Sequence, residues 1–183
     1  MKRVSPSRLF RAHQFAFLIG LSDGILTALT LAAGSVVGSH APIRIQLALR
    51  IAAASSLSGT FVFFTAEYAK LRGELVHAER QLSLTSHGRL AATRLGRAVL
   101  LESLSGAALA SICNFVGALF PLLVGAVLPG PPWLAAIAAI IALGVLGVVI
   151  AYSVHGNPFR WTIGLMMAGG ILTIAGAQLH VVS

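Results

Sequence analysis

The sequence predicts an all-α integral membrane protein, built as a single bundle of five transmembrane helices over residues 1–183. Apolar residues make up 57% of the chain and charged residues only 10%, with a mean hydropathy of +0.89. A soluble domain needs more polar surface than this composition supplies. Several apolar stretches also reach the length of about 20 residues that a helix needs to cross roughly 30 Å of hydrocarbon.

The expected spans are residues 15–37, 43–70, 98–128, 133–154 and 159–182. Short turns separate most of them, at residues 38–42, at "PGPP" (129–132) and at "HGNP" (155–158). The second span is longer than a perpendicular helix needs, so it must tilt or project from the bilayer. Pro121 favours a bend in the third span because proline removes a helix hydrogen bond. The short basic segment 71–97 is expected in the cytosol.

The positive charges predict the orientation, because cytoplasmic loops carry an excess of Lys and Arg. Arg44 and Arg50 stand on one side of the expected spans. The other basic residues all stand on the opposite side: Lys2, Arg3, Arg8, Arg11, Lys70, Arg72, Arg80, Arg89, Arg94, Arg97 and Arg160. The amino end is therefore expected in the cytoplasm, which in a bacterium means a protein of the plasma (inner) membrane. The net charge of +8 belongs to these loops and indicates membrane lipid rather than nucleic acid as a partner.

The first span contains an acid in the stretch "GLSDGILTALTLAAG", residues 20–34. Asp23 lies near mid-membrane, where an ionised Asp costs about 3 kcal/mol on insertion scales. It must face protein or water, or be protonated. It is either an ion or proton site, or a hydrogen-bonding acid that locks helices together. Gly20 and Gly24 allow close approach of another helix, or a local unwinding of this one.

Two further acids extend this pattern toward the cytoplasm. Glu67 lies near the cytoplasmic end of the second span, and Glu102 near the cytoplasmic start of the third. Together with Asp23 they form a candidate path, and their carboxylate oxygens suit divalent cations such as Mn²⁺ or Fe²⁺. Alternatively, Glu67 and Glu102 are interfacial residues that reach toward water.

The remaining candidates are weaker. Glu74 shares a helix face with Glu67, with Lys70 between them, which fits a salt-bridged surface stripe or a metal-gathering extension of the helix. Methionine thioethers could bind a soft metal, but they more often serve packing. The other metal candidates are Glu79, Asn114, Met166 and Met167. No nucleophile–base pattern, phosphate loop or cysteine cluster is present, so we expect neither an enzyme nor a resident cofactor.

Four segments carry a resemblance to a known family: "GLSDGILTALTLAAG", "AEYAKLRGELVHAER", "AALASICNFVGALFPLL" and "GLMMAGGILTIAGAQLH". In these segments, and in their order, the chain resembles the vacuolar iron transporter family, including its nodulin-like members. The resemblance implies a homodimeric exporter of ferrous iron or manganese that works by proton antiport. It implies that Asp23 is the family's intramembrane aspartate, that Glu67 is the glutamate of its Gly-Glu-Tyr motif, and that Glu79 belongs to its cytosolic metal-binding domain.

The chain also departs from the family pattern. Val62 and Phe63 stand where the family has a Ser-Met pair, and Ala66 replaces the glycine before the glutamate. The acidic cytosolic helices are replaced by a basic segment, which repels divalent cations. These departures motivate a second hypothesis: a non-transporting interaction subunit of a larger membrane complex, built on a degenerate transporter fold.

Overall fold

The computed structural model describes residues 6–37, 45–81, 94–127 and 133–178. This part of the chain forms five helices: α1 (Pro6–Val37), α2 (Ile45–Gln81), α3 (Arg94–Val127), α4 (Trp133–Val154) and α5 (Pro158–Gln178). Each of the five contains a segment long and apolar enough to cross a membrane. The all-α class and five helices of membrane-spanning length and composition are therefore confirmed for the described residues, which is consistent with a multi-pass integral membrane protein. Its orientation and oligomeric state stay predictions.

The helix ends differ from the expected spans on the basic side of the bundle. α1 begins at Pro6 rather than at residue 15, α2 continues to Gln81, and α3 begins at Arg94. The helices continue because the flanking residues are mostly good helix formers such as Leu, Arg, Lys and Glu. Segment 71–97 is thus helical over 71–81 and 94–97, while residues 82–93, like the predicted turns 38–42 and 129–132, lie outside the described part.

The length of α2 confirms that this helix must tilt or project. Its 37 residues correspond to about 55 Å, well beyond the roughly 30 Å of hydrocarbon in a bilayer. Pro121 is buried inside α3 and does not end it, since the helix continues to Val127. A proline removes one backbone hydrogen bond, and here its ring is covered by neighbouring helices.

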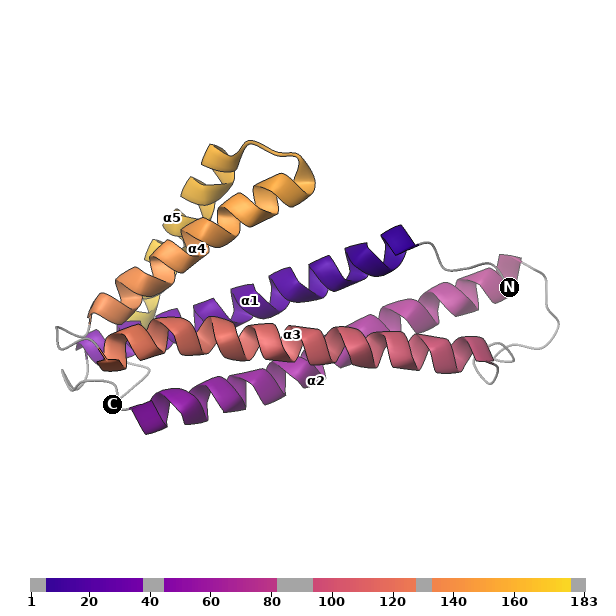
Figure 1. The fold of residues 1–183 in the computed structure, drawn as a ribbon, viewed down its shortest axis with the longest axis horizontal. Helices are drawn as coiled ribbons and strands as arrows, with labels where there is room; N and C mark the ends of the chain where they lie inside the picture. Colours follow the sequence, from indigo (N-terminus) through magenta and orange to yellow (C-terminus); the bar gives the residue numbers. More distant parts are fainter. Residues whose placement is uncertain (1–5, 38–44, 82–93, 128–132, 179–183) are drawn as a thin grey trace.

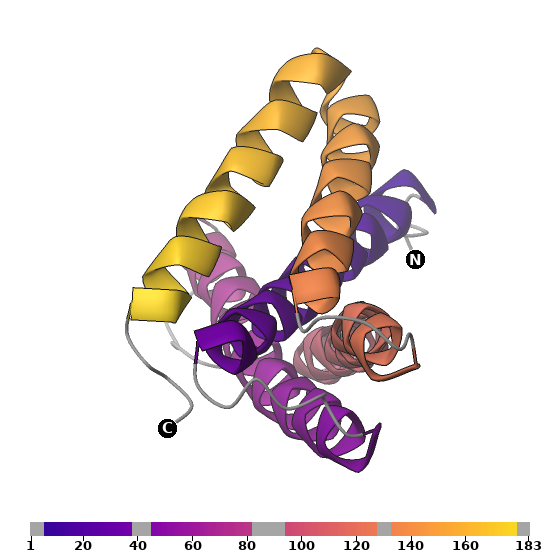
Figure 2. The same ribbon diagram turned by 90° about the vertical axis from the view of Figure 1, so that its left-hand side faces the viewer.

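α1 occupies the centre of the bundle. Figure 1 shows α1, α2 and α3 running alongside one another, with the α4–α5 hairpin diverging from them. Seen from the end, α1 lies between α2 and α3 on one side and α4 and α5 on the other (Figure 2). The start of α1, the end of α2 and the start of α3 lie at one end of the bundle (Figure 1). The basic flanking segments therefore share one end.

Small residues let α1 and α3 approach closely. A Cβ built on Gly20 or Gly24 would collide with the backbone carbonyl oxygen of Ala110 or Asn114, and one on Gly117 would lie 2.8 Å from the Leu21 carbonyl oxygen. In lipid, helices associate through such contacts rather than through the hydrophobic effect. The predicted close approach is confirmed, and α1 stays helical through Gly20 and Gly24 instead of unwinding.

The turn between α4 and α5 follows the predicted "HGNP" signal. His155 adopts a positive φ of 55°, and the Gly156 amide donates to the Ala151 carbonyl at 2.8 Å. Asn157 caps α5, because its Oδ1 accepts a hydrogen bond from the Phe159 amide at 3.1 Å. Pro158 fits the first helical position, where no amide hydrogen is needed.

Candidate functional site

Asp23 meets Asn114 across the α1–α3 contact. The Asn114 Nδ2 group donates a hydrogen bond of 2.6 Å to Asp23 Oδ2. The Asn114 residue is 1% exposed, whereas Asp23 is exposed at the surface of the bundle. The close packing of Gly24 onto α3 brings the two side chains together, because Gly24 follows Asp23 and touches the backbone of Asn114.

The Asn114 amide is held from α2 as well. Ser55 Oγ donates to Asn114 Oδ1 at 3.1 Å, and Asn114 Nδ2 also donates to the Ser55 carbonyl oxygen at 3.3 Å. The Thr27 hydroxyl lies 3.0 Å from Ser55 Oγ and 2.9 Å from the Asp23 carbonyl oxygen, to which it donates. We call Asp23, Thr27, Ser55 and Asn114 the polar cluster. It joins α1, α2 and α3.

The two oxygens of the Asp23 carboxylate have different surroundings. Oδ2 accepts from the amide, while Oδ1 has no hydrogen-bond partner within the described residues. Asp23 thus forms a hydrogen bond between helices, as expected for an acid that locks helices together. Its second oxygen is still accessible, as an ion or proton site requires. An ionised Asp in hydrocarbon costs about 3 kcal/mol or more, so an ionised Asp23 in a membrane requires water, an ion or another protein at this second oxygen.

A second hydroxyl contact joins α2 to α3 near the polar cluster. Ser56 Oγ lies 2.9 Å from the Ser111 carbonyl oxygen, to which it donates, and 2.7 Å from Ser111 Oγ. Sequence reasoning selected Asp23 and Asn114 but missed Thr27, Ser55 and this pair. The signal was the presence of adjacent serines in an apolar span, with a threonine one turn after Asp23.

Glu67 of α2 and Glu102 of α3 lie at the same depth along the helix pair. Ser55 faces Asn114, and the Phe63 ring lies 3.1 Å from where a Gly106 Cβ would be, which fixes the antiparallel register of α2 and α3. Glu67 lies one turn after Phe63 in α2, and Glu102 lies one turn before Gly106 in α3. Their predicted common depth is therefore supported by the packing. Along α2, Glu67 lies about 12 Å beyond Gly59, the residue whose Cβ would face Asp23.

The Glu67 side chain is mostly buried and forms an ion pair with Lys70. Its side chain is 16% exposed, and Oε1 lies 3.7 Å from Nζ of Lys70, whose side chain is 59% exposed. The Glu102 side chain is half-buried. The ion pair fits the predicted salt-bridged stripe, and it also places a positive charge where a metal ion would have to approach.

The other candidates do not join these residues. Glu74 is exposed on α2, and the side chain of Glu79 lies outside the described part. Met166 packs toward Gly144 of α4, and Met167 is 63% exposed on α5. Within the described ranges, no three His, Cys, Asp or Glu side chains gather as a metal-ion site. The structure therefore unites Asp23 with Asn114 and aligns Glu67 with Glu102, but it does not gather the four acids whose side chains it describes, Asp23, Glu67, Glu74 and Glu102.

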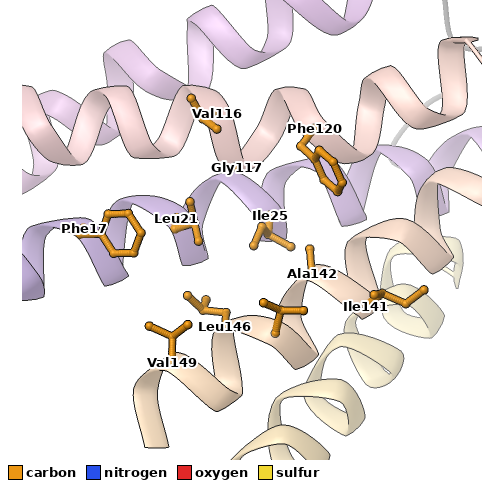
Figure 3. A pocket seen from close by; sticks show the side chains of 11 residues that line it. Phe17, Leu21, Ile25, Val116, Gly117, Phe120, Ile141, Ala142, Leu146 and Val149 are labelled. Atoms are coloured by element: carbon orange, nitrogen blue, oxygen red, sulfur yellow. The ribbon is translucent and has the colours of Figure 1, made fainter. Parts of the chain in front are cut away.

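An apolar groove of about 460 Å³ lies between α1, α3 and α4 (Figure 3). Its lining includes Phe17, Ile25, Phe120 and Ile141 and contains no charged side chain. Ile25 stands on the face of α1 roughly opposite to Asp23, because two residues along a helix correspond to a rotation of about 200°. The groove therefore offers no ligand to an ion and is separate from the polar cluster.

Comparison with family models and with curated proteins finds no match for this chain. The function of the polar cluster therefore has to be inferred from its own geometry and chemistry.

Proposed function

We propose that the protein is a secondary transporter that exports ferrous iron or manganese from the cytoplasm, with Asp23 and Glu67 on the ion path. The observation that carries this proposal is the Asp23 carboxylate, exposed in the apolar helix α1, with one oxygen held by Asn114 and the other without a partner among the described residues. An acid in such a place marks an ion or proton pathway more often than a lipid-facing surface.

The chemistry of the site suits a hard divalent cation. Carboxylate oxygens are ligands that Mn²⁺ and Fe²⁺ share with Mg²⁺ and Ca²⁺, and the exposed Asp23 carboxylate offers one. A proton and a metal ion compete for the same ionised oxygen, which gives an exchange mechanism without any further group. The resemblance adds the homodimer to this proposal.

Glu67 and Glu102 provide the cytoplasmic entrance in this proposal. They lie at the same depth, in the half of α2 that ends at Gln81 and the half of α3 that begins at Arg94. Lys70 competes with an arriving cation for Glu67, since its ammonium group lies 3.7 Å from Oε1. Entry of a metal ion therefore requires Lys70 to move away, which its exposed position allows.

The test is Mn²⁺ flux into proteoliposomes that contain the wild type, Asp23→Asn or Glu74→Gln. We expect Asp23→Asn to lower flux at least about tenfold, the effect of losing an interaction of about 1.4 kcal/mol or more in the rate-limiting complex. Glu74→Gln is the control, because Glu74 is exposed and outside the cluster, and it should leave flux unchanged. Equal flux in Asp23→Asn and wild type would remove Asp23 from the path.

One observation favours the second candidate, an interaction subunit. In the most apolar window of α5 only 6% of the residues are buried, compared with 22% to 44% in the other spans. Such a helix offers a long face to a partner in a larger membrane complex. A wild type that neither moves nor binds metal, yet co-purifies in fixed ratio with other membrane proteins, would replace the transporter proposal with this one.

A further inference from the structure

The polar cluster holds its amide in one orientation. The Asn114 side-chain amide has a hydrogen-bond donor, Nδ2, and an acceptor, Oδ1. A 180° rotation of the amide group exchanges their positions. Ser55 contacts both ends: its hydroxyl donates to Oδ1 at 3.1 Å and its carbonyl accepts from Nδ2 at 3.3 Å. A reversed amide would place its oxygen against two acceptors, the Ser55 carbonyl oxygen and Asp23 Oδ2, and would lose both bonds that Nδ2 donates.

From this arrangement we propose that Ser55 and Asn114 are positioning residues for Asp23. Ser55 keeps Nδ2 of the Asn114 amide against Oδ2 of Asp23, so that Oδ1 of Asp23 is the oxygen presented to the transported ion. The identity of that cargo as a divalent cation rests on the proposed function, whereas the orientation of the carboxylate by Ser55 does not.

Gly59 supports this role independently. A Cβ at position 59 would collide with Asn114 Nδ2 and lie 3.1 Å from Asp23 Oδ2. The α2 backbone therefore approaches the amide–carboxylate pair at a residue without a side chain. Gly in a helix is less favourable than Ala by about 1 kcal/mol, so the close approach to the pair is achieved against local helix preference.

The neighbouring Ser56 gives a matched control. It too is a serine of α2 that bonds to α3, through the carbonyl and hydroxyl oxygens of Ser111. It has no hydrogen bond to Asp23 or Asn114 in the described part of the chain. Ser55→Ala and Ser56→Ala each remove one helix-joining hydroxyl, but only Ser55→Ala removes the hydrogen bond that anchors Asn114 Oδ1.

The experiment compares both variants with the wild type and with Ser55→Thr in proteoliposomes, over a range of Mn²⁺ concentrations. We expect Ser55→Ala to raise KM for Mn²⁺ about three- to tenfold, the effect of one lost hydrogen bond, with little change in the maximal rate. Ser56→Ala should keep the wild-type KM, and Ser55→Thr, which keeps the hydroxyl, should restore it. Equal KM values in Ser55→Ala and Ser56→Ala would overturn the proposal.

A second measurement separates this inference from the proposed function. The infrared band of the Asp23 carboxyl group, identified by its loss in Asp23→Asn, reports the hydrogen bonding of that group without any transport. We expect the band to shift in Ser55→Ala and to stay in place in Ser56→Ala. If the wild type moves no Mn²⁺ but this difference appears, the metal-transport function fails and the positioning role stands. If the band is the same in both variants, the positioning role fails even where transport is found.

Discussion

Gly24→Ala tests the contact on which the polar cluster depends. The added Cβ would collide with the Asn114 carbonyl oxygen and stand 2.7 Å from the Ala118 backbone nitrogen. Both atoms belong to the α3 backbone and cannot rotate away, unlike the end of a side chain. α1 and α3 must therefore separate, and the 2.6 Å hydrogen bond between Asn114 and Asp23 must lengthen or break.

The expected loss of stability follows from two terms. Overpacking a well-packed contact costs about 1–3 kcal/mol. The Asp23–Asn114 hydrogen bond adds about 0.6 kcal/mol, the average for side-chain hydrogen bonds inside membrane proteins. Ala also gains helix propensity over Gly, by up to about 1 kcal/mol, which a matched control removes. Gly164→Ala on α5 is that control, because nothing lies within 4 Å of its added Cβ. The two variants should differ by roughly 2–4 kcal/mol.

The assay is reversible unfolding of the purified protein in mixed micelles with increasing dodecyl sulfate. Gly24→Ala should unfold at a clearly lower dodecyl sulfate fraction than Gly164→Ala. Gly106→Ala should fall between them, because its Cβ would meet the Phe63 ring at 3.1 Å and a ring can turn aside. A Gly24→Ala protein as stable as Gly164→Ala would show that α1 and α3 do not touch at this point, and the geometry of the polar cluster would fall with it.

Two further substitutions test other parts of the molecule. Asn157→Ala removes the cap of α5 and should lower the free energy of unfolding by about 0.5–2 kcal/mol in the same assay, whereas Asn157→Ser should recover most of it. An unchanged midpoint for Asn157→Ala would mean that the cap contributes nothing. Met167→Leu should leave Mn²⁺ flux at the wild-type level, because Met167 is exposed on α5 and has no described contact with the polar cluster. Loss of flux in this variant would instead place a thioether on the ion path.

Hydropathy predicted the five spans but not the ends of the helices. The boundaries of α4 at Trp133 and Val154 agree with the expected span, because the apolar run and the helix end together there. At the basic end of α2 the apolar run stops near Lys70 while the helix continues to Gln81. Hydropathy reports which residues can contact lipid, whereas helix length depends on backbone hydrogen bonding and residue propensity, which the polar residues there also support.

The candidate site was predicted in part for a similar reason. Asp23 stood out because an acid in an apolar span is costly, and this argument needs no knowledge of its neighbours. Its partner Asn114 is 91 residues away along the chain, and Ser55, which contacts Asn114, belongs to a third helix, α2. Which residues meet depends on the register between helices. That register is set by small-residue contacts such as Gly20 with Ala110, and a hydropathy pattern contains no information on it.

The surroundings of Asp23 argue against a purely structural acid. A carboxylate that only locks helices would be expected to have both oxygens bonded within the bundle, because an unbonded polar atom away from water costs free energy. Here the chain supplies one amide to Oδ2, and α2 passes the pair with Gly59, which has no side chain to offer a second donor. A serine hydroxyl does lie close by, but Ser55 donates to Asn114 rather than to Asp23. Within the described residues, the remaining oxygen has no partner, and something else has to meet it when Asp23 is ionised in a membrane. Water, a cation and a group from a second copy each meet that need, and a bound cation would compete with a proton for that oxygen.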